Sequence, residues 1–267
     1  MKQNLLKNKI IQPDWEAPVN VKSLVTTRCD GYSKAPFDSF NLGAHVEDNN
    51  DNVRKNRQRL AELLPSEPIW LNQVHSDLVV DAGKTISGAD ADGSYTTQAN
   101  VVSVVLTADC LPVLVCTRQG DGVAALHAGW RGLANGILEQ GIEKLLAATK
   151  RRPEDLLVWL GPAIGPENFE VGEDVRQSFL QQSMQNSHYY TQIEQCFTPS
   201  KNTSDEKNKW FADIYQLARI RLSLMGVENC SGGNYCTYND KEKFYSYRRD
   251  GKTGRMASLI WLVSPHP

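Results

Sequence analysis

The chain has 267 residues, of which 29 are basic and 31 are acidic, and its formal net charge is −2. Its hydrophobic content of 40% and charged content of 22% are ordinary for a globular protein, and a chain of this length can bury a substantial core. The balanced charge creates no global field that would attract nucleic acid or an anionic membrane, so we expect neither as a partner. An anionic ligand would have to be met by a local cluster of basic groups.

The start of the chain and its cysteines both predict a cytoplasmic protein. Lysines interrupt residues 1–11 every few positions, and the apolar run and small-residue cleavage site of a signal peptide are absent there. No stretch reaches the ~18 consecutive apolar residues of a membrane-spanning helix. The six cysteines form no Cys-x-x-Cys pair, which favours free thiols in a reduced compartment over a disulfide framework.

Three apolar runs in the middle of the chain predict neighbouring strands. Residues 101–107 are β-branched and almost all apolar, as in a strand covered on both faces. Residues 111–117 form a second run, which ends at a glycine-containing turn, and residues 123–127 form a third. Cys110 therefore lies in the connection between two predicted strands, and His127 ends the next one.

After Gly129 the apolar residues recur at helical spacing, which predicts one amphipathic helix over residues 130–149. Its N-terminus would open beside His127. Exposed backbone N–H groups there, together with the Arg131 side chain, would suit an anion or the oxygens of a transition state.

The second half of the chain alternates strands and helices. Residues 156–160 predict a strand that a loop rich in Gly and Pro closes, and residues 171–182 and 210–225 predict helices. Residues 199–208 form a polar loop that is either a lid or a plain surface insertion. Because strands and helices interleave and no linker divides the chain, we predict one α/β domain with mixed sheets over residues 1–267.

Two histidines and one cysteine form a candidate metal centre. Cys110 and His127 lie at the ends of apolar strands, and His75 lies upstream of both. Two imidazoles and one thiolate fill three positions of a tetrahedral zinc ion and leave the fourth for water or substrate, as in a catalytic zinc site. We therefore interpret the protein as an enzyme with one zinc ion per chain.

Six motifs, taken together in this order, resemble one known family. They are Phe40-Asn41-Leu42-Gly43, Gln73-Val74-His75, Thr107-Ala108-Asp109-Cys110-Leu111-Pro112, His127-Ala128-Gly129-Trp130-Arg131-Gly132, Gly161-Pro162-Ala163-Ile164-Gly165 and Tyr247-Arg248-Arg249-Asp250. The family is that of the multicopper polyphenol oxidase-like, laccase-domain or peptidoglycan-editing-factor proteins. The resemblance covers about residues 23–262, and six motifs in one order are a specific signal.

The resemblance implies a four-layer α/β/β/α domain related to cysteine-hydrolase-like toxin folds, with zinc on His75, Cys110 and His127. Members are described as purine nucleoside enzymes that combine phosphorolysis of adenosine, inosine and methylthioadenosine with adenosine deamination. A nucleoside and phosphate are then the expected small-molecule partners. Some bacterial members are instead assigned to removal of a wrongly attached serine from a nucleotide-linked muramyl peptide. Both substrate classes stay open at the level of the sequence, as does the oligomeric state.

The two nucleoside reactions ask for different residues. Zinc deaminases use a carboxylate as proton carrier, and because the chain has no His-x-Glu signature, Asp109 and Glu173 are the candidates to act beside Cys110 and His127. Phosphorolysis instead needs groups that hold phosphate beneath the ribose while the purine leaves.

The candidates for substrate binding are Arg28, Asn41, Arg131 and Arg248. Arginine suits phosphate because its planar fork meets two oxygens at once. Arg248 and its neighbour Arg249 could instead cap a strand or pair with Asp250. Asn41 could instead bond its own backbone in a turn.

Three other interpretations use the same residues. The ligand set resembles that of a blue-copper site, but five histidines are too few for a laccase and its trinuclear cluster, so copper is expected only as an adventitious substitute. Cys110 could act as a thiolate nucleophile with His127 as base, in an amidase. A zinc ion could also only staple a non-enzymatic binding module.

Overall fold

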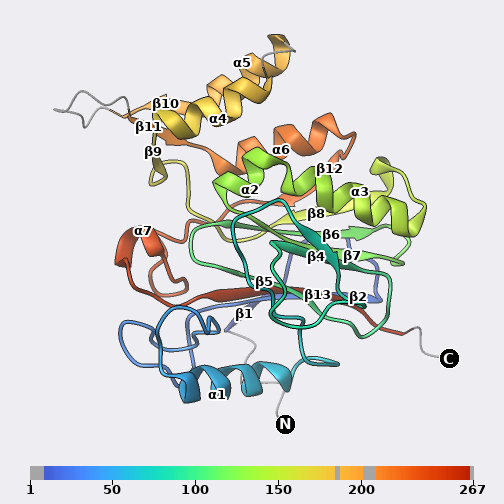
Figure 1. The fold of residues 1–267 in the computed structure, drawn as a ribbon, viewed down its shortest axis with the longest axis vertical. Coiled ribbons are helices and arrows are strands. Elements are labelled where there is room, and N and C mark those ends of the chain that lie inside the picture. The colour runs from blue at the N-terminus through green and yellow to red at the C-terminus, as the bar shows by residue number, and fades with distance from the viewer. Residues whose placement is uncertain (1–8, 184–186, 201–208, 265–267) are drawn as a thin grey trace.

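Two β-sheets pack face to face and helices cover their outer faces in the computed structural model, which describes residues 9–183, 187–200 and 209–264 (Figure 1). The first sheet has the strand order β1-β2-β13-β5, and the second has the order β12-β8-β6-β7-β4-β3. Helix α1 (Asn50–Ala61) lies below the first sheet, and α2 (Trp130–Asn135), α3 (Ile137–Thr149) and α6 (Ile214–Leu224) lie above the second. The structure confirms the α/β class with mixed sheets, and it has the four layers that the resemblance implied.

The strands of the first sheet are β1 (Ile10–Ile11), β2 (Val21–Thr26), β5 (Ser103–Thr107) and β13 (Met256–Leu262). Those of the second are β3 (Val79–Asp81), β4 (Gly93–Thr96), β6 (Leu111–Thr117), β7 (Val123–Ala128), β8 (Leu156–Leu160) and β12 (Asn229–Gly232). A small third sheet of β9 (Glu170–Gly172), β10 (Phe197–Pro199) and β11 (Lys209–Ala212) lies near α4 (Glu173–Ser183) and α5 (Ser187–Gln195). Two short turns, the 3₁₀ turn η2 (Pro153–Asp155) and α7 (Tyr247–Asp250), complete the described elements.

Alternate residues of the central strands enter different layers of the core. In β6, Val113 packs toward the helices, whereas Leu114 packs toward the other sheet. In β13, Leu259 packs in the layer that includes Leu60 of α1, whereas Ile260 packs between the sheets. Both faces of these strands are buried, which explains why their sequences are apolar at nearly every position.

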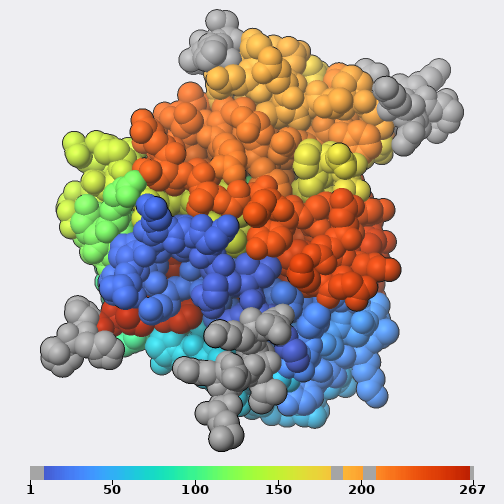
Figure 2. Space-filling model, turned by 180° about the vertical axis from the view of Figure 1, so that it is seen from behind, coloured from blue at the N-terminus to red at the C-terminus, as the bar shows by residue number. Residues whose placement is uncertain are grey.

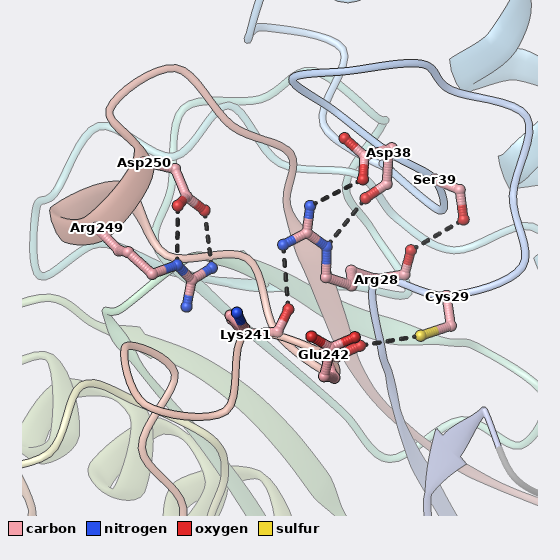
Figure 3. A pocket seen from close by; sticks show the side chains of 8 residues that line it. All are labelled: Arg28, Cys29, Asp38, Ser39, Lys241, Glu242, Arg249 and Asp250. Atoms are coloured by element: carbon pink, nitrogen blue, oxygen red, sulfur yellow. Dashed lines mark hydrogen bonds and ion pairs between the residues drawn. The ribbon is translucent and has the colours of Figure 1, made fainter.

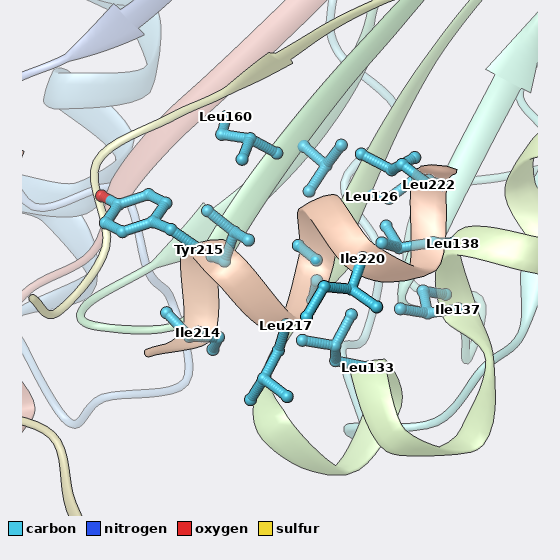
Figure 4. Close-up of a cluster of buried hydrophobic side chains, with 14 of the residues drawn as sticks. Leu126, Leu133, Ile137, Leu138, Leu160, Ile214, Tyr215, Leu217, Ile220 and Leu222 are labelled. Atoms are coloured by element: carbon cyan, nitrogen blue, oxygen red, sulfur yellow. The ribbon is translucent and has the colours of Figure 1, made fainter. Parts of the chain in front are cut away.

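The outer core layer joins α2, α3 and α6 to the second sheet. Its buried side chains include Leu126, Leu133, Ile137, Leu138, Leu160, Leu217, Ile220 and Leu222 (Figure 4). Each fully buried Leu or Ile contributes roughly 1.5–3 kcal/mol of burial free energy. This layer therefore holds the helices firmly over the strands that carry the candidate metal ligands.

The predicted helix over residues 130–149 is two helices, so that prediction was wrong. Helix α2 ends at Asn135, and Gly136 adopts φ 108° before α3 begins at Ile137. A side chain is strained in that backbone conformation, so glycine allows the chain to turn between the helices. The anion site expected at the start of a long helix thus rests on a helix of six residues, in which fewer aligned peptide dipoles add up.

The predicted helices over residues 171–182 and 210–225 begin later than expected. Their first residues belong to β9 and β11, which pair antiparallel. Pairing between these strands outweighs the helical spacing of their side chains. Asp213 then accepts a hydrogen bond from the backbone N–H of Gln216 at 2.9 Å and caps α6.

Of the polar loop predicted at residues 199–208, Pro199 ends β10, and the Ser200 hydroxyl donates to the carboxylate of Glu170 at 2.7 Å. Residues 201–208, and with them the suggested lid, lie outside the described residues. The strands predicted at 111–117 and 156–160 are confirmed to the residue.

Segments far apart in the sequence share one face of the molecule. Figure 2 shows N-terminal residues in blue against C-terminal residues in orange. At this junction the backbone N–H of Arg28 donates to the carbonyl of Lys243 at 2.8 Å. All six cysteines lie within the described residues and are free thiols, as predicted. In the described part of the chain, no helix is long and apolar enough to cross a membrane.

Gly136→Ala should lower the free energy of unfolding by about 1 kcal/mol, because alanine would have to adopt a left-handed conformation. Space is not the obstacle, since the nearest atom to an added Cβ lies 3.6 Å away. Urea denaturation measures the change. Gly136→Asn is the matched control and should cost less, because asparagine visits this region more readily. Equal stability of wild type and Gly136→Ala would contradict the assignment.

Candidate metal centre

The pairing of β6 with β7 places Cys110 beside His127. The two strands are antiparallel, and Leu111, the first residue of β6, pairs with Ala128, the last residue of β7. Cys110 directly precedes Leu111, so its thiol and the His127 imidazole meet at one end of the second sheet. His75, from the loop before β3, completes the group.

These three side chains are the one group among the described residues whose spacing suits a metal ion. Their ligand atoms all lie within 4.8 Å of one another, and Cys110 Sγ lies 4.0 Å from His75 Nε2. Gly129 permits this approach, because a Cβ there would lie 3.1 Å from both Cys110 Sγ and His75 Cδ2. His127 is buried and His75 is exposed, so the group is reached from the His75 side.

Asp92, which the sequence analysis missed, connects two of the three candidate ligands. Its buried carboxylate accepts hydrogen bonds from His127 Nδ1 at 2.8 Å and from the backbone N–H groups of His75 and Ser76 at 3.0 and 2.6 Å. The Ser76 hydroxyl and the Val74 N–H donate to it as well. This contact fixes the His127 tautomer and leaves Nε2 for a metal ion. The only signal in the sequence was an acidic residue directly before a short strand.

Two residues of the site adopt a left-handed backbone conformation without being glycine. They are His75, with φ 59°, and Asp109, with φ 92°. Such positions cost on the order of 1–3 kcal/mol and persist only where surrounding contacts hold them. Asp92 holds the N–H of His75, and the N–H of Ile164 donates to the carbonyl of Asp109 at 3.0 Å.

The negative charge of Cys110 and the positive charge of His127 stabilise each other. Burial acts to raise the pKa of the Cys110 thiol, but the charge and hydrogen bond of His127 outweigh burial and lower this pKa to about 6. Burial acts to lower the pKa of His127, but the charge of Cys110 and the hydrogen bond to Asp92 raise it to about 9. At neutral pH the protein groups therefore favour a thiolate, the form of cysteine that binds metal or acts as a nucleophile.

Burial also acts to raise the pKa of the Asp92 carboxyl, yet the hydrogen bonds from His127 and Ser76 outweigh it and hold this pKa below its usual value. Asp92 therefore stays ionised at neutral pH.

A cavity of about 500 Å³ opens next to the group, a volume in the range of small-molecule sites. Its apolar lining includes Leu106, Ala108, Trp130, Ile164 and Phe169, and its polar lining includes His45, Gln73, Asp109, Tyr247 and the arginines Arg131, Arg248 and Arg255. A flat aromatic or heterocyclic ligand would find both an apolar wall and hydrogen-bonding groups here.

None of the three cavity arginines has a carboxylate partner among the described residues. Arg131 stacks on Trp130, with 4.3 Å from the guanidinium carbon to the ring centroid. The Arg248 side chain donates to the carbonyl of Asn168 at 3.2 Å, and that of Arg255 donates only to backbone carbonyls. Several arginines elsewhere do form ion pairs. The cavity therefore gathers three guanidinium groups that form no ion pair with a carboxylate among the described residues, close to the Cys110 thiolate.

The structure places Arg28 in a different cavity, of about 460 Å³ (Figure 3). Its guanidinium donates to the carboxylate and the carbonyl of Asp38 at 3.2 and 3.0 Å and to the Lys241 carbonyl at 3.2 Å. Arg249 lines the same cavity as Arg28 and pairs with Asp250 at 2.7 Å. Neither arginine lines the cavity of the candidate metal centre, so the structure does not bring Arg28 to it.

Asn41 is fully buried and lines neither cavity. Its side-chain oxygen accepts hydrogen bonds from the backbone N–H groups of Gly43 and Arg255, both at 2.9 Å. Its side-chain nitrogen donates to Asp48 at 2.9 Å. The turn contact considered as an alternative is therefore present. Asn41 does not reach the cavity to contact a substrate, and its side chain instead orients the backbone of Arg255.

Asp109 lines the cavity, but both of its carboxylate oxygens already accept hydrogen bonds. The donors are the Thr237 hydroxyl at 2.6 Å and the backbone N–H of Arg248 at 2.7 Å. The geometry favours a role in positioning α7 over that of a proton carrier. Glu173 begins α4, bonds to Trp210 and does not line the cavity.

Sequence analysis placed neither Arg255 nor His45 in the site, yet both line the cavity. Arg255 directly precedes Met256, which pairs with Thr107 at the end of β5. Because Cys110 follows Thr107 by three residues, the pairing of β13 with β5 brings Arg255 to the same end of the molecule. That pairing joins segments about 150 residues apart in the chain and could not be deduced from either segment alone.

Comparison with known proteins shows what this chain is similar to. A family model described as multi-copper polyphenol oxidoreductase laccase matches residues 22–263. A Pseudomonas aeruginosa protein named purine nucleoside phosphorylase is 48% identical over 255 residues, which cover 96% of this chain and 99% of that protein. An Escherichia coli protein named purine nucleoside phosphorylase YfiH is 48% identical over 259 residues, which cover 96% of this chain and 100% of that protein. A crystal structure of a Neisseria meningitidis protein has a TM-score of 0.84 and 44% identity, and covers 96% of this chain and 100% of its own.

Asp92→Asn should weaken metal binding by about 10- to 100-fold, because the amide no longer accepts from both His127 and the loop of His75. The melting temperature should also fall, since buried donors lose their acceptor. Competition with a chromophoric chelator measures the affinity. Asp90→Asn is the matched control, since Asp90 is exposed and accepts only from Asn72. Wild-type affinity in Asp92→Asn would show that this carboxylate does not orient the ligands.

Proposed function

This chain belongs to the multi-copper polyphenol oxidoreductase laccase family, and on that premise we propose that it is a zinc-dependent purine nucleoside phosphorylase. The names of the relatives that are 48% identical over almost their whole length support this activity. The observation that carries the proposal is the cavity, in which three arginines without carboxylate partners lie beside the group of His75, Cys110 and His127.

The arginines make an anionic co-substrate the natural complement of this cavity. A partly buried guanidinium without an ion-pair partner is destabilised by its lost hydration. An oxyanion with several oxygens restores the hydrogen bonds. Among the residues that line the cavity, Asp109 is the one with a carboxylate, and its oxygens are committed to Thr237 and Arg248. The other anionic group of the lining is the Cys110 thiolate, whose charge zinc would offset when bound, so phosphate would meet little repulsion here.

The donor set fits zinc. Two imidazoles and one thiolate are usual zinc ligands, and the hydrogen bond from His127 Nδ1 to Asp92 is of the kind that orients a zinc-bound histidine. When bound, zinc would supply Lewis acidity toward an oxygen of the substrate. His75, Cys110 and His127 would hold it.

In phosphorolysis a phosphate oxygen forms a bond to ribose C1′, and the bond from C1′ to the purine nitrogen breaks. The purine leaves with the electron pair and takes up a proton, which gives free base and ribose 1-phosphate. The arginines would hold the phosphate in line with C1′, and the apolar wall of Trp130, Ile164 and Phe169 would contact the purine and exclude water.

The structure supports phosphorolysis more directly than the other reactions considered. Adenosine deamination in this cavity needs a proton carrier, and both oxygens of Asp109 already have donors. Polyphenol oxidation by a multicopper mechanism needs several copper sites, and the described residues contain one suitable group. Copper in place of zinc on that group stays an adventitious substitution.

Base release from adenosine or inosine should require phosphate and should yield ribose 1-phosphate, because the cavity is built to hold an oxyanion. Chromatography of the zinc-loaded protein, with and without phosphate, measures both products. Cys110→Ala should lose bound zinc and this activity while its circular dichroism is unchanged. Equal base release without phosphate would identify hydrolysis and remove the argument from the arginines.

An amidase that acts on a muramyl peptide or a related amide is a second candidate, and one observation favours it. Cys110, His127 and Asp92 form a chain of thiolate, imidazole and orienting carboxylate, the order of groups in a cysteine hydrolase. In that reaction Cys110 would attack the amide carbonyl and His127 would protonate the leaving amine.

Removal of metal with a chelator separates the two candidates. A zinc phosphorylase should lose activity on chelation and regain it with added zinc. A cysteine hydrolase should keep its amidase activity, with a rate that rises with pH as the thiolate forms around pH 6, since the pKa of Cys110 is lowered to about 6. Cys110→Ser is the control for both. An amidase rate that depends on zinc would exclude the thiolate mechanism.

A further inference from the structure

Arg255 differs from the other two arginines of the cavity in how the fold holds it. Its Nη1 donates to the carbonyls of Thr253 and Gly254 at 2.9 and 3.0 Å. Its Nε and Nη2 have no acceptor among the described residues. One edge of the planar guanidinium is thus anchored, and the opposite edge keeps two N–H donors side by side, which is the geometry that meets two oxygens of a tetrahedral anion.

The position of Arg255 is fixed from behind. Its backbone N–H is bound by the side chain of Asn41, which is fully buried. Its side-chain stem lies against Gly43, where a Cβ would come within 2.8 Å of Arg255 Cγ. The segment from Asn41 to Gly43 therefore contacts both the backbone and the side-chain stem of Arg255 and fixes their position. By contrast, Arg131 and Arg248 are exposed, and their guanidinium groups lie over the rings of Trp130 and Phe169.

Arg255 also lies where two cavities meet. A second cavity of about 320 Å³ shares His45, Tyr247 and Arg255 with the cavity of the metal centre. The shared wall carries one arginine, one histidine and one phenol and no carboxylate. The nearest acid in the second cavity, Glu47, is exposed and pairs with Lys252 at 2.7 Å. Burial lowers the pKa of the Arg255 guanidinium and outweighs the nearby charges of Cys110 and Asp109, neither of which forms an ion pair with it.

We propose that Arg255 is the residue that binds the phosphate co-substrate, through Nε and Nη2, at the junction of the two cavities. Phosphate held there would lie beside His45, whose ring can donate a further hydrogen bond. The inference rests on the proposed phosphorolysis for its biological meaning, but the binding site itself is defined by the geometry of Arg255. Arg131 and Arg248 then contact the nucleoside or the rim of the cavity.

Calorimetric titration of the zinc-loaded protein with inorganic phosphate, in the absence of nucleoside, tests the site directly. Arg255→Ala should weaken phosphate binding by about 10- to 100-fold, as expected for the loss of a charge-assisted pair of hydrogen bonds. Arg255→Lys should recover only part of the affinity, because lysine keeps the charge and loses the fork. Arg118→Ala, at an exposed arginine outside both cavities, is the matched control and should bind like wild type.

Gly43→Ala provides a variant that leaves Arg255 itself in place. The added methyl group should displace the guanidinium and weaken phosphate binding, with unchanged zinc content. In steady-state kinetics, both Gly43→Ala and Arg255→Ala should raise the apparent KM for phosphate far more than the KM for the nucleoside. A merely structural role of Arg255 would instead lower the melting temperature and the zinc content together and leave the two KM values in their wild-type ratio.

The results separate this inference from the proposed function. Weaker phosphate binding in the Arg255 variants supports the site even if no free base is released, in which case only the phosphorylase proposal fails. Phosphate-dependent base release with wild-type phosphate affinity in Arg255→Ala and Gly43→Ala overturns the inference and keeps the proposed function. Weakened binding of adenosine 5′-monophosphate alone, with inorganic phosphate unaffected, would also overturn it, because the site would then serve a phosphoryl group of the substrate.

Discussion

The carboxylate of Asp92 is the contact on which the candidate metal centre depends. It directly precedes β4 and accepts hydrogen bonds from Nδ1 of His127 on the neighbouring strand and from the backbone N–H groups of the loop that carries His75. One buried acid therefore joins a strand residue, whose position the sheet fixes, to a loop residue, whose position the sheet does not fix. The left-handed backbone conformation of His75 persists because Asp92 accepts a hydrogen bond from its N–H group.

The cavity beside the centre shows the opposite electrostatic design. Around Asp92 every charge has its partner, whereas the three arginines of the cavity lack carboxylate partners among the described residues. Three arginines outnumber the two acidic groups of the lining, Asp109 and the Cys110 thiolate, so the cavity favours anions at neutral pH. The family description names copper and polyphenols, and the arginines of this lining add groups that suit an oxyanion.

Prediction from the sequence succeeded where structure is decided locally. The strands at 111–117 and 156–160 are runs of mostly apolar residues bounded by turns, and their bounds follow from that pattern. The helix predicted over 130–149 failed at Gly136, since helical spacing continues through a residue whose backbone conformation breaks the helix. The starts of the helices near residues 171 and 210 failed because those segments pair with each other as strands, and side-chain spacing does not reveal a partner.

The sequence by itself determined that His75, Cys110 and His127 are chemically suited to one metal ion, because two imidazoles and one thiolate are usual zinc ligands and Cys110 and His127 lie at the ends of apolar runs. Only the tertiary structure decided which groups surround them. The pairing of β13 with β5 brings in Arg255, that of β4 with β7 brings in Asp92, and the contact of Arg28 with Asp38 turns that arginine toward another cavity. The physical reason is that strand register joins residues far apart in the chain, and burial then decides which polar groups must satisfy each other and which stay available to a ligand.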